Sequence, residues 1–381
     1  MTAFWGIHGS MGEGCSIETM VYPCPPPDRL EPLWRGLEDR CDAGVFRSWA
    51  WIGCVLDVFA PRALVVEARC AGRVVGLALV GLGKAAFPGG RPRGHLGETG
   101  LTEHDRIMIE YNGVLAEPGW AAQVSRAGLD AVLNAGSPRC GELRLSGVDG
   151  QWFDLCRHAG VDWRLLRLRQ GAPYADLRAM DATDPLRSLS KNSREQIRRS
   201  IRRFEDIGPV GLSRAESIGQ SLEWFRELEF LHTASWARRG NAGAFGGKDF
   251  AAFHRRLIAR TFDQGVVDLL RLSAGKTVLG YLYNLRWHDR VYAYQSGFTH
   301  ADDPRWRPGL VAHLLAMRRY GNEKISVYHF LAGDARYKQS LSNGSDTLYW
   351  MAAYRSSLLR RIEDLARRFL RPEAASGPPT I

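Results

Sequence analysis

The stretch between residues 266 and 342 constrains the fold most, because short apolar runs alternate there with tight polar turns. Runs of this length and spacing predict antiparallel strands joined by hairpin turns. The predicted strands are 266–272, 278–287 and 291–297, and the predicted turns are Ala274-Gly275-Lys276 and His288-Asp289-Arg290. A linker rich in turn-forming residues, 299–308, follows this meander.

A helix and one further strand are predicted after this linker. The helix begins at Gly309 and Leu310, and its apolar residues recur close to helical spacing. The strand covers residues 325–331 and leads into the segment 333–338. Because the first N–H groups of a helix have no partner within it, this helix start is suited to bind phosphate. The pattern therefore predicts a site for a nucleotide-linked donor.

The earlier part of the chain predicts a similar mixture of elements. Predicted helices are 28–41, 48–59, 119–135 and 151–159, and predicted strands are 63–68, 74–82, 107–110, 142–146 and 163–168. Helices that alternate with hairpin-linked strands predict a mixed α/β (α+β) fold. A chain of 381 residues is long enough for two domains that each bury a core.

Several segments together resemble the GNAT-type acyltransferases, and specifically the subgroup of FemAB-like and cellulose-biosynthesis-type acetyltransferases. The segments that carry the resemblance are GYLYNLRWHDRVYAYQSGF, RPGLVAHLLAMRRYG, VYHFLAGDARYKQSL, SLSKNSREQIRRSIRRFEDIG and LEFLHTASWARRGNAGAFGG. Two upstream segments, GVFRSWAWIGCVL and ALVVEARCAGRVVGLALVGL, resemble the start of a first GNAT-like half. The resemblance covers most of residues 28–355 and is strongest after Leu189.

This resemblance implies two tandem GNAT-like halves, each a mostly antiparallel sheet flanked by helices. We expect a flexible leader at 1–27, an N-terminal half on the acceptor side at 28–180, a C-terminal acyltransferase half at 181–371 and a disordered tail at 372–381. An amphipathic helix is predicted between 358 and 369, within the last part of the C-terminal half.

The resemblance also implies where a thioester donor binds. The candidate donor-binding residues are Tyr292, Arg305, Arg307, Gly309, Leu310 and Tyr337. The pyrophosphate loop of the family has two small residues, whereas the stretch 305–311 here keeps one glycine and is bulkier. Three donors therefore stay open: acyl-CoA, an acyl group on the phosphopantetheine of a carrier protein, and aminoacyl-tRNA. No metal is expected as a cofactor.

Acyl transfer to an amine needs a deprotonated amine, a fixed thioester carbonyl and stabilisation of the oxyanion. The resemblance implies a splayed strand whose backbone N–H faces the thioester, and this strand maps to 291–297. The candidate catalytic residues are His232, Tyr294, Asp334 and Lys338. Asp334 and Lys338 match a GDxxYK-like ending of the subgroup, and the alternative for this pair is a structural salt bridge. The alternative for His232 is a core histidine.

Two segments are candidates for acceptor binding. The first is the distinctive stretch 97–115, in which Glu110, Tyr111 and Asn112 are proposed to line a cleft, against the alternative of a polar loop beside an edge strand. The second contains Trp236, Arg239 and Phe245, near a glycine-rich loop that is expected to act as a lid. The acceptor is expected to be an amine of a sugar, a lipid precursor or a peptide side chain such as lysine or ornithine.

The net charge of +10 favours anionic partners, including the phosphates of a donor, an acidic carrier protein or RNA. Six basic residues and one acidic residue lie between 191 and 203, which predicts a helix that grips an anion or a solvated basic face. No apolar run has the roughly 20 residues of a membrane helix. With no recognisable signal peptide at the N-terminus, a cytoplasmic location is expected.

Competing classes lack their sequence signatures. The chain contains no P-loop, nucleophile elbow, HExxH zinc helix or dinucleotide fingerprint, and its seven cysteines form no CxxC pair. The function predicted from the sequence is an N-acyltransferase that uses a thioester donor. The alternatives are an aminoacyl-tRNA-dependent Fem-like transferase and a non-catalytic GNAT-like scaffold.

Overall fold

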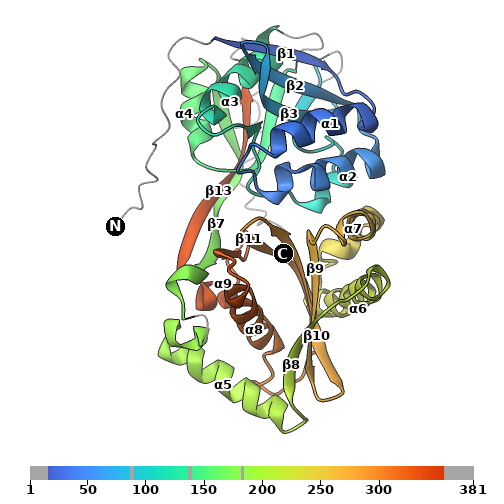
Figure 1. Ribbon diagram of the computed structural model, residues 1–381, viewed down its shortest axis with the longest axis vertical. Helices are drawn as coiled ribbons and strands as arrows, with labels where there is room; N and C mark the ends of the chain where they lie inside the picture. The colour runs from blue at the N-terminus through green and yellow to red at the C-terminus, as the bar shows by residue number, and fades with distance from the viewer. Residues whose placement is uncertain (1–15, 86–89, 136–139, 182–183, 356–381) are drawn as a thin grey trace. The chain divides into compact units, whose positions relative to one another are not determined.

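The computed structural model describes residues 16–85, 90–135, 140–181 and 184–355. These residues divide into two compact units, unit 1 (16–169 and 348–355) and unit 2 (170–347). Figure 1 labels the helices and most of the strands of both. The chain leaves unit 1 within strand β7, Asp162–Asp176, and returns to it within strand β13, Gly344–Tyr354.

Unit 1 is built on strands that are mostly antiparallel. Its strands are β1 (Ile17–Pro23), β2 (Ala63–Cys70), β3 (Arg73–Gly83), β4 (Arg93–Leu96), β5 (Leu115–Ala116) and β6 (Glu142–Val148), with the last part of β13. Their order is β1-β2-β3-β4-β6-β13, and β5 pairs with β3. Only β4 and β6 run parallel among these described pairs, over Arg93–His95 and Glu142–Arg144.

Four α-helices complete the described part of unit 1: α1 (Pro27–Glu38), α2 (Trp49–Phe59), α3 (Ala121–Asp130) and α4 (Gln151–His158). Short 3₁₀ turns lie at Val45–Arg47 and His104–Ile107, and a π turn follows α3 at Ala131–Ala135. The Ser48 side chain caps α2 by accepting from the N–H of Trp51, which satisfies one of the free donors at the helix start.

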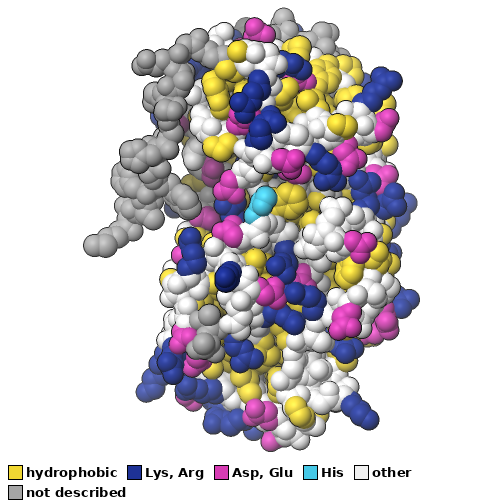
Figure 2. All heavy atoms as spheres, viewed as in Figure 1, with side chains coloured by type: hydrophobic (Ala, Val, Ile, Leu, Met, Phe, Trp, Pro, Cys, Tyr) yellow, Lys and Arg dark blue, Asp and Glu magenta, His cyan; other side chains and the backbone are white. Residues whose placement is uncertain are grey.

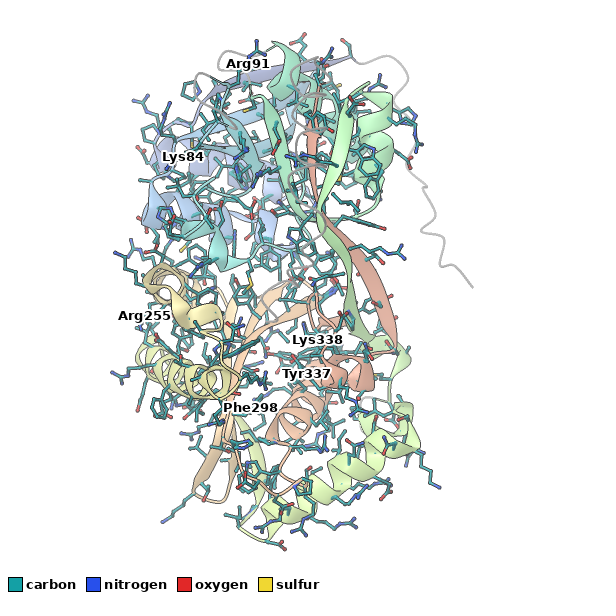
Figure 3. The ribbon with its side chains drawn as sticks, turned by 180° about the vertical axis from the view of Figure 1, so that it is seen from behind. Lys84, Arg91, Arg255, Phe298, Tyr337 and Lys338 are labelled. Carbon is teal, nitrogen blue, oxygen red and sulfur yellow. The ribbon has the colours of Figure 1, made fainter. Side chains whose placement is uncertain are left out.

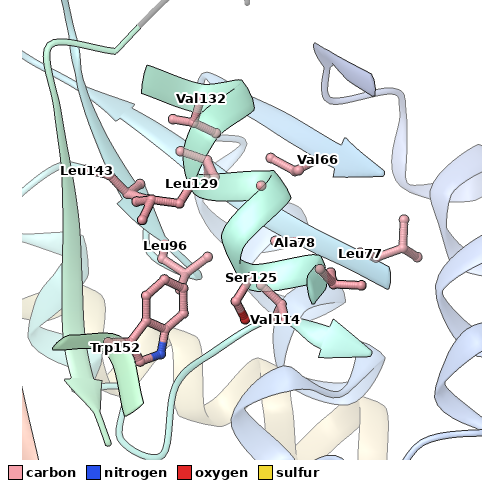
Figure 4. Close-up of a pocket in the computed structure, with 13 residues that line it drawn as sticks. Val66, Leu77, Ala78, Leu96, Val114, Ser125, Leu129, Val132, Leu143 and Trp152 are labelled. Carbon is pink, nitrogen blue, oxygen red and sulfur yellow. The ribbon is translucent and has the colours of Figure 1, made fainter. Parts of the chain in front are cut away.

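The core on one face of the unit 1 sheet contains apolar residues of α3 and α4 together with alternate residues of β2 and β3. A small pocket remains there beneath α3, lined by Val66, Leu96, Leu129 and Trp152 among others (Figure 4). Its lining offers the Ser125 hydroxyl but no charged side chain. We interpret it as a gap in the core, because phosphates would find no counter-charge there.

Unit 2 has the same order of elements, preceded by an extra helix. After two 3₁₀ turns (Leu177–Ala179 and Pro185–Ser188), its elements are α5 (Lys191–Glu205), β8 (Val210–Arg214), α6 (Ile218–Ala237), a 3₁₀ turn (Ala244–Gly246), α7 (Lys248–Thr261), β9 (Val267–Ala274), β10 (Thr277–Trp287), β11 (Arg290–Phe298), α8 (Pro308–Asn322), β12 (Val327–His329) and α9 (Arg336–Leu341). The strand order is β7-β12-β11-β10-β9-β8, in which β11 and β12 run parallel.

Helices cover both faces of the unit 2 sheet (Figure 1). Leu282 of β10 belongs to a core that includes residues of α5 and α8. Its neighbours Tyr281 and Tyr283 contact Trp224 and Phe225 of α6. Because successive residues of a strand point to opposite faces, α8 and α6 cover opposite faces of the sheet.

The structure confirms the mixed α/β class, with a largely antiparallel sheet and flanking helices in each unit. Three expectations were wrong in detail. Residues 17–23, expected in a flexible leader, form β1 on β2, and their exposure alternates along the first five residues as it does in a strand with one covered face. Residues 107–110 form no strand, because Ile107 ends a 3₁₀ turn and 108–110 are irregular. The end of β13 was expected in the C-terminal half (181–371). By its contacts it belongs to unit 1, because its apolar residues pair with β6.

The division by contacts falls at 169/170 and 347/348, whereas the sequence suggested a boundary near 180. The predicted helix at 358–369, the tail at 372–381 and most of the predicted leader lie outside the described residues. In the described part of the chain, no helix is both long enough and apolar enough to cross a membrane.

Candidate active site

The candidate site begins where two parallel strands of unit 2 separate. Strand β11 pairs with β12 at Arg290–Val327, Val291–Tyr328 and Tyr292–His329, and the pairing ends there. Strand β11 nevertheless continues on β10 as far as Phe298. Along residues 293–298, no described strand pairs with the outer side of β11. A free strand edge can bind an extended group through backbone hydrogen bonds.

A β-bulge changes the direction of β11 within this free edge. The register with β10 shifts between Tyr283–Gln295 and Asn284–Ala293, so Tyr294 is the extra residue. Bulges are frequent next to active sites, where they redirect side chains. Tyr294 is 4% exposed and lies against Phe250 and His254, with ring centroids 6.2 and 4.8 Å away.

Helix α8 begins shortly after β11, as the sequence predicted. Pro308 occupies its first turn, which sets the backbone for a helix without losing a bonded N–H. Arg305 and Arg307 lie in the preceding loop, and both are already engaged. Arg305 forms a two-pronged ion pair with Asp303, and Arg307 donates from Nε to the carbonyl of Pro304. Hydrogen bonds from Arg305 lower the pKa of Asp303, so this pair is ionised at neutral pH.

An aromatic wall stands beside this helix start. His313 of α8 stacks on Tyr337 of α9 at a centroid distance of 5.1 Å and lies 6.5 Å from the ring of Phe298. Figure 3 labels Phe298 and Tyr337 in this region. The hydroxyl of Tyr328 and Nδ1 of His313 form a hydrogen bond of 2.8 Å. Burial, together with the charge of Lys338, lowers the pKa of His313 to about 3, so this imidazole is neutral.

Tyr292, a predicted donor-binding residue, stacks on His329 at the last paired position of the two strands. The ring centroids are 4.9 Å apart and the planes differ by 10°. Gly309 and Leu310 lie in the first turn of α8, where Leu310 joins the core and Gly309 lies next to the ring of Phe298. The sequence-predicted donor residues therefore gather around the end of β11 and the start of α8.

His232 lies on α6 under the glycine-rich loop that follows this helix. It is 4% exposed, and its Nδ1 finds no hydrogen-bond partner among the described residues. Burial, and then the charge of Arg239, lower the pKa of His232 to about 4. A base with so low a pKa is weak at neutral pH, so His232 is better suited to accept a hydrogen bond than to remove a proton from an ammonium group.

The three predicted acceptor residues of unit 2 surround His232. Trp236 and Phe245 lie 5.8 and 5.0 Å from its ring, and the guanidinium of Arg239 lies over Trp236 at 5.2 Å. Gly243 has a φ of +62°, and a Cβ there would lie 2.7 Å from His232 Cε1. The loop can approach the histidine this closely because position 243 has no side chain.

Lys338, a predicted catalytic residue, is buried and holds the turn after β12. Its Nζ donates to the carbonyls of Leu331 and Ala332, at 3.1 and 2.6 Å (labelled in Figure 3). Leu331 has a φ of +62°, which is unfavourable for a residue with a side chain. Asp334 is exposed, and the hydrogen bonds of Lys338 described above go to backbone carbonyls rather than to Asp334.

The remaining predicted acceptor residues belong to unit 1. Asn112 donates from Nδ2 to the carbonyl of Leu96 and accepts from the N–H of Gly113, so its side chain holds the loop together. Glu110 is 3% exposed. Tyr111 is half-buried and has a φ of +50°, an unfavourable conformation of the kind that concentrates at functional sites.

The basic run predicted between 191 and 203 lies on α5. Ile197, Ser200 and Phe204 are buried, whereas Arg198, Arg199 and Arg202 are exposed. Figure 2 shows basic side chains gathered over this helix. The helix is therefore amphipathic and presents arginines to the solvent.

Sequence reasoning missed two residues of the site and one cluster in unit 1. His313 and His329 form the walls beside Phe298 and Tyr292, and the only sequence signal was a histidine within each apolar run. The cluster contains His95, Glu98 and Asp105, whose ligand atoms all lie within 4.8 Å of one another. The sequence predicts no metal site at these three residues.

Residues 191–339 match the family model of the acetyltransferase (GNAT) domain. No curated protein is similar enough in sequence to be matched. The solved structure of FemX has a TM-score of 0.61 at 10% identity, over 91% of this chain and 99% of FemX.

Two further solved structures resemble the chain over most of its length. The C-terminal domain of a putative lysylphosphatidylglycerol synthetase from Agrobacterium fabrum has a TM-score of 0.55 at 9% identity, over 91% of this chain and 97% of that one. L-PGS from Bacillus licheniformis has a TM-score of 0.52 at 11% identity, over 91% and 96%. At such identities the likeness shows the fold alone. The chain therefore has the fold of FemX and L-PGS, and its residues 191–339 match the GNAT acetyltransferase domain.

Proposed function

We propose that this chain is a GNAT-type N-acyltransferase. It transfers an acyl group from a thioester donor, acyl-CoA or an acyl carrier protein, to an amine of a sugar, a lipid precursor or a peptide side chain such as lysine or ornithine. The observation that carries the proposal is the end of the β11–β12 pairing at Tyr292 and His329, which leaves residues 293–298 of β11 with a free edge.

The free edge suits the pantetheine part of a thioester donor. Pantetheine contains two amides, which pair with a strand edge as a neighbouring strand does. The N–H groups along the same edge are donors for the oxyanion that forms when an amine attacks the thioester carbonyl. The bulge at Tyr294 redirects this residue within the edge, and its phenol is the group that we propose protonates the departing thiolate.

The start of α8 suits the phosphates of the same donor. The N–H groups of residues 309 and 310 lie in the first turn, where the helix leaves donors unpaired and its dipole favours an anion. Arg305 and Arg307 are exposed in the loop before it, and each can exchange its present partner for a phosphate.

An aminoacyl-tRNA-dependent transferase is the second candidate. The likeness of the fold to FemX and the exposed arginines of α5 favour it. The parallel pair of strands would hold the reacting ester in the same place. The two candidates differ in the surface that their donors need. RNA needs an extended basic surface, whereas the phosphates of a thioester donor need only one helix start.

The test compares donors on the purified full-length protein. Acetyl-CoA, medium- and long-chain acyl-CoA, acyl carrier protein and free tRNA are added in turn, and melting temperature is measured. We expect one thioester to raise the melting temperature and to release free thiol when a suitable amine is present. A response to tRNA alone would establish the second candidate, and no response to any thioester would contradict the first.

A substitution separates binding from chemistry. Tyr294→Phe removes one hydroxyl without changing the ring packing, so we expect an unchanged melting response to the donor and a turnover at least tenfold slower, about 1.4 kcal/mol in the barrier. Tyr349→Phe makes the same change in the part of β13 that belongs to unit 1, at a residue that is not itself a candidate, and serves as the control.

A further inference from the structure

A cluster of one imidazole and two carboxylates lies in unit 1 and uses none of the candidate residues of unit 2. His95 ends the parallel pair of β4 and β6, Glu98 follows in the next turn, and Asp105 lies in the 3₁₀ turn His104–Ile107. Nδ1 of His95 is 4.0 Å from Oε2 of Glu98 and 3.9 Å from Oδ2 of Asp105. These gaps are too long for hydrogen bonds.

The imidazole of His95 is not held by any other described side chain or backbone group. The residue is 8% exposed, and its ring makes no hydrogen bond to another described residue. Nδ1 therefore faces two carboxylates without a hydrogen bond to a described residue, which leaves it available as a metal ligand. Two atoms bound to one ion at about 2.1 Å each lie at most about 4.2 Å apart. Both gaps to Nδ1 satisfy this limit, and all three ligand atoms lie within 4.8 Å of one another.

The two carboxylates are held in position by their own hydrogen bonds. Oε2 of Glu98 accepts from the hydroxyl of Ser146 at 2.8 Å. Asp105 accepts from the N–H and the hydroxyl of Thr99 and from the N–H of Gly100, at 2.8, 2.7 and 3.0 Å. Such supporting bonds orient carboxylates that bind metals.

Four glycines allow the surrounding backbone to pack this closely. A Cβ on Gly81 would lie 2.1 Å from the carbonyl of Glu98, and one on Gly83 would lie 2.9 Å from Nε2 of His95. Gly97 and Gly100 have φ values of +68° and +84°. The turn that carries Glu98 can therefore lie directly on β3, next to the histidine.

We propose that His95, Glu98 and Asp105 bind a divalent transition-metal ion of the zinc class. One imidazole nitrogen and two carboxylate oxygens suit zinc better than magnesium or calcium, which prefer oxygen ligands alone. The ion ties β4, the turn after it and the 3₁₀ turn together. Asn112 donates to the carbonyl of Leu96, so the same ion stabilises the base of the segment that holds Glu110 and Tyr111.

The test measures zinc binding to the full-length protein after treatment with a chelator. Isothermal titration with zinc chloride should show one site, and Glu98→Gln, Asp105→Asn and His95→Gln should each weaken it at least tenfold. Glu98→Gln and Asp105→Asn keep the size of the side chain and its capacity to accept a hydrogen bond. Far-ultraviolet circular dichroism and the metal-free melting temperature show that each variant is folded.

Glu67→Gln is the matched control, because Glu67 is also a buried carboxylate of unit 1, bonded to Tyr22 and Arg69 instead. It should bind zinc as the wild type does. Cobalt in place of zinc should give a visible spectrum without thiolate bands. No zinc binding by the wild type, equal binding by all variants, or a thiolate spectrum would each overturn the proposal. None of these outcomes depends on acyltransferase activity.

Discussion

The two units share one order of elements, yet they use the space after their parallel strands differently. In unit 1, β4 has four residues and ends one residue after its last pair with β6. In unit 2, β11 has nine residues and continues well beyond its last pair with β12. A free edge of backbone therefore exists in unit 2, whereas in unit 1 the chain turns away at Gly97.

The loops that follow the parallel strands also differ in charge between the two units. Residues 97–120 of unit 1 contain five acidic residues and one arginine, whereas residues 299–307 of unit 2 contain two of each. An anionic donor would be repelled more strongly by the first loop than by the second. One architecture thus offers a phosphate-compatible helix start in unit 2 and a candidate cation site in unit 1.

The largest expected effect concerns the buried charges of unit 1. Glu142 is fully buried, and Arg164, Arg144 and Arg93 contact it at 2.8, 3.1 and 3.7 Å. Glu142→Gln leaves these arginines without a counter-charge, so we expect the free energy of unfolding to fall by about 3 kcal/mol at pH 7. Chemical denaturation measures this loss. Glu195→Gln, in an exposed pair with Arg198, should cost less than about 0.5 kcal/mol.

The same carboxylate predicts a pH dependence. Burial alone would raise the pKa of Glu142, but Arg164 and Arg144 outweigh burial and lower it from 4.5 to about 2. The folded state thus binds this proton more weakly than the unfolded state. The stabilisation is complete above about pH 4.5 and is lost as the pH falls towards 2. The difference between wild type and Glu142→Gln should shrink over this range, and a constant difference would contradict the assignment.

The second effect concerns the turn after β12 in unit 2. Lys338→Met removes the ammonium group from the carbonyls of Leu331 and Ala332 and leaves both buried without it. We expect the free energy of unfolding to fall by about 2–3 kcal/mol. Lys191→Met, on the exposed first turn of α5, is the control and should change it little. If Lys338→Met is as stable as the control but inactive, Lys338 acts on the substrate directly.

Local patterns made much of unit 2 predictable. The meander expected at 266–272, 278–287 and 291–297 is observed as β9, β10 and β11, because alternation and turn residues act over short distances. Gly275 and His288 have the positive φ values that tight turns require. The helix start expected at Gly309 is observed one residue earlier, where proline is favoured.

Long-range contacts made the rest unpredictable. The pairing of β13 with β6 joins residues about 200 positions apart, and no local pattern encodes it. Lys338 was predicted from a motif to act on substrate, but which carbonyls it contacts depends on the turn at Leu331. The approach of Asp105 to His95 likewise depends on glycines of a third segment, and their role is visible only in three dimensions.

The third effect tests the loop over His232. Gly243→Ala adds a Cβ at an unfavourable φ and only 2.7 Å from Cε1 of His232. We therefore expect the free energy of unfolding to fall by about 1–2 kcal/mol and the turnover to be reduced. Gly240→Ala, with a φ of +71° and open space around it, carries only the backbone strain. The excess loss in Gly243→Ala measures the contact with His232. Equal stability and equal turnover in the two variants would exclude a role for this close approach.

The smallest effect bears most directly on the comparison of the two units. Gly309→Glu places a carboxylate in the first turn of α8, where donor phosphates are proposed to bind, and should weaken donor binding about tenfold, or about 1.4 kcal/mol. Gly309→Gln adds the same bulk beside Phe298 without the charge and separates sterics from repulsion. Ala121→Glu makes the equivalent change in the first turn of α3 in unit 1 and should leave binding unchanged. If Ala121→Glu weakens donor binding and Gly309→Glu does not, the donor binds to unit 1. The contrast between a free strand edge and a closed one then no longer explains which unit binds the donor.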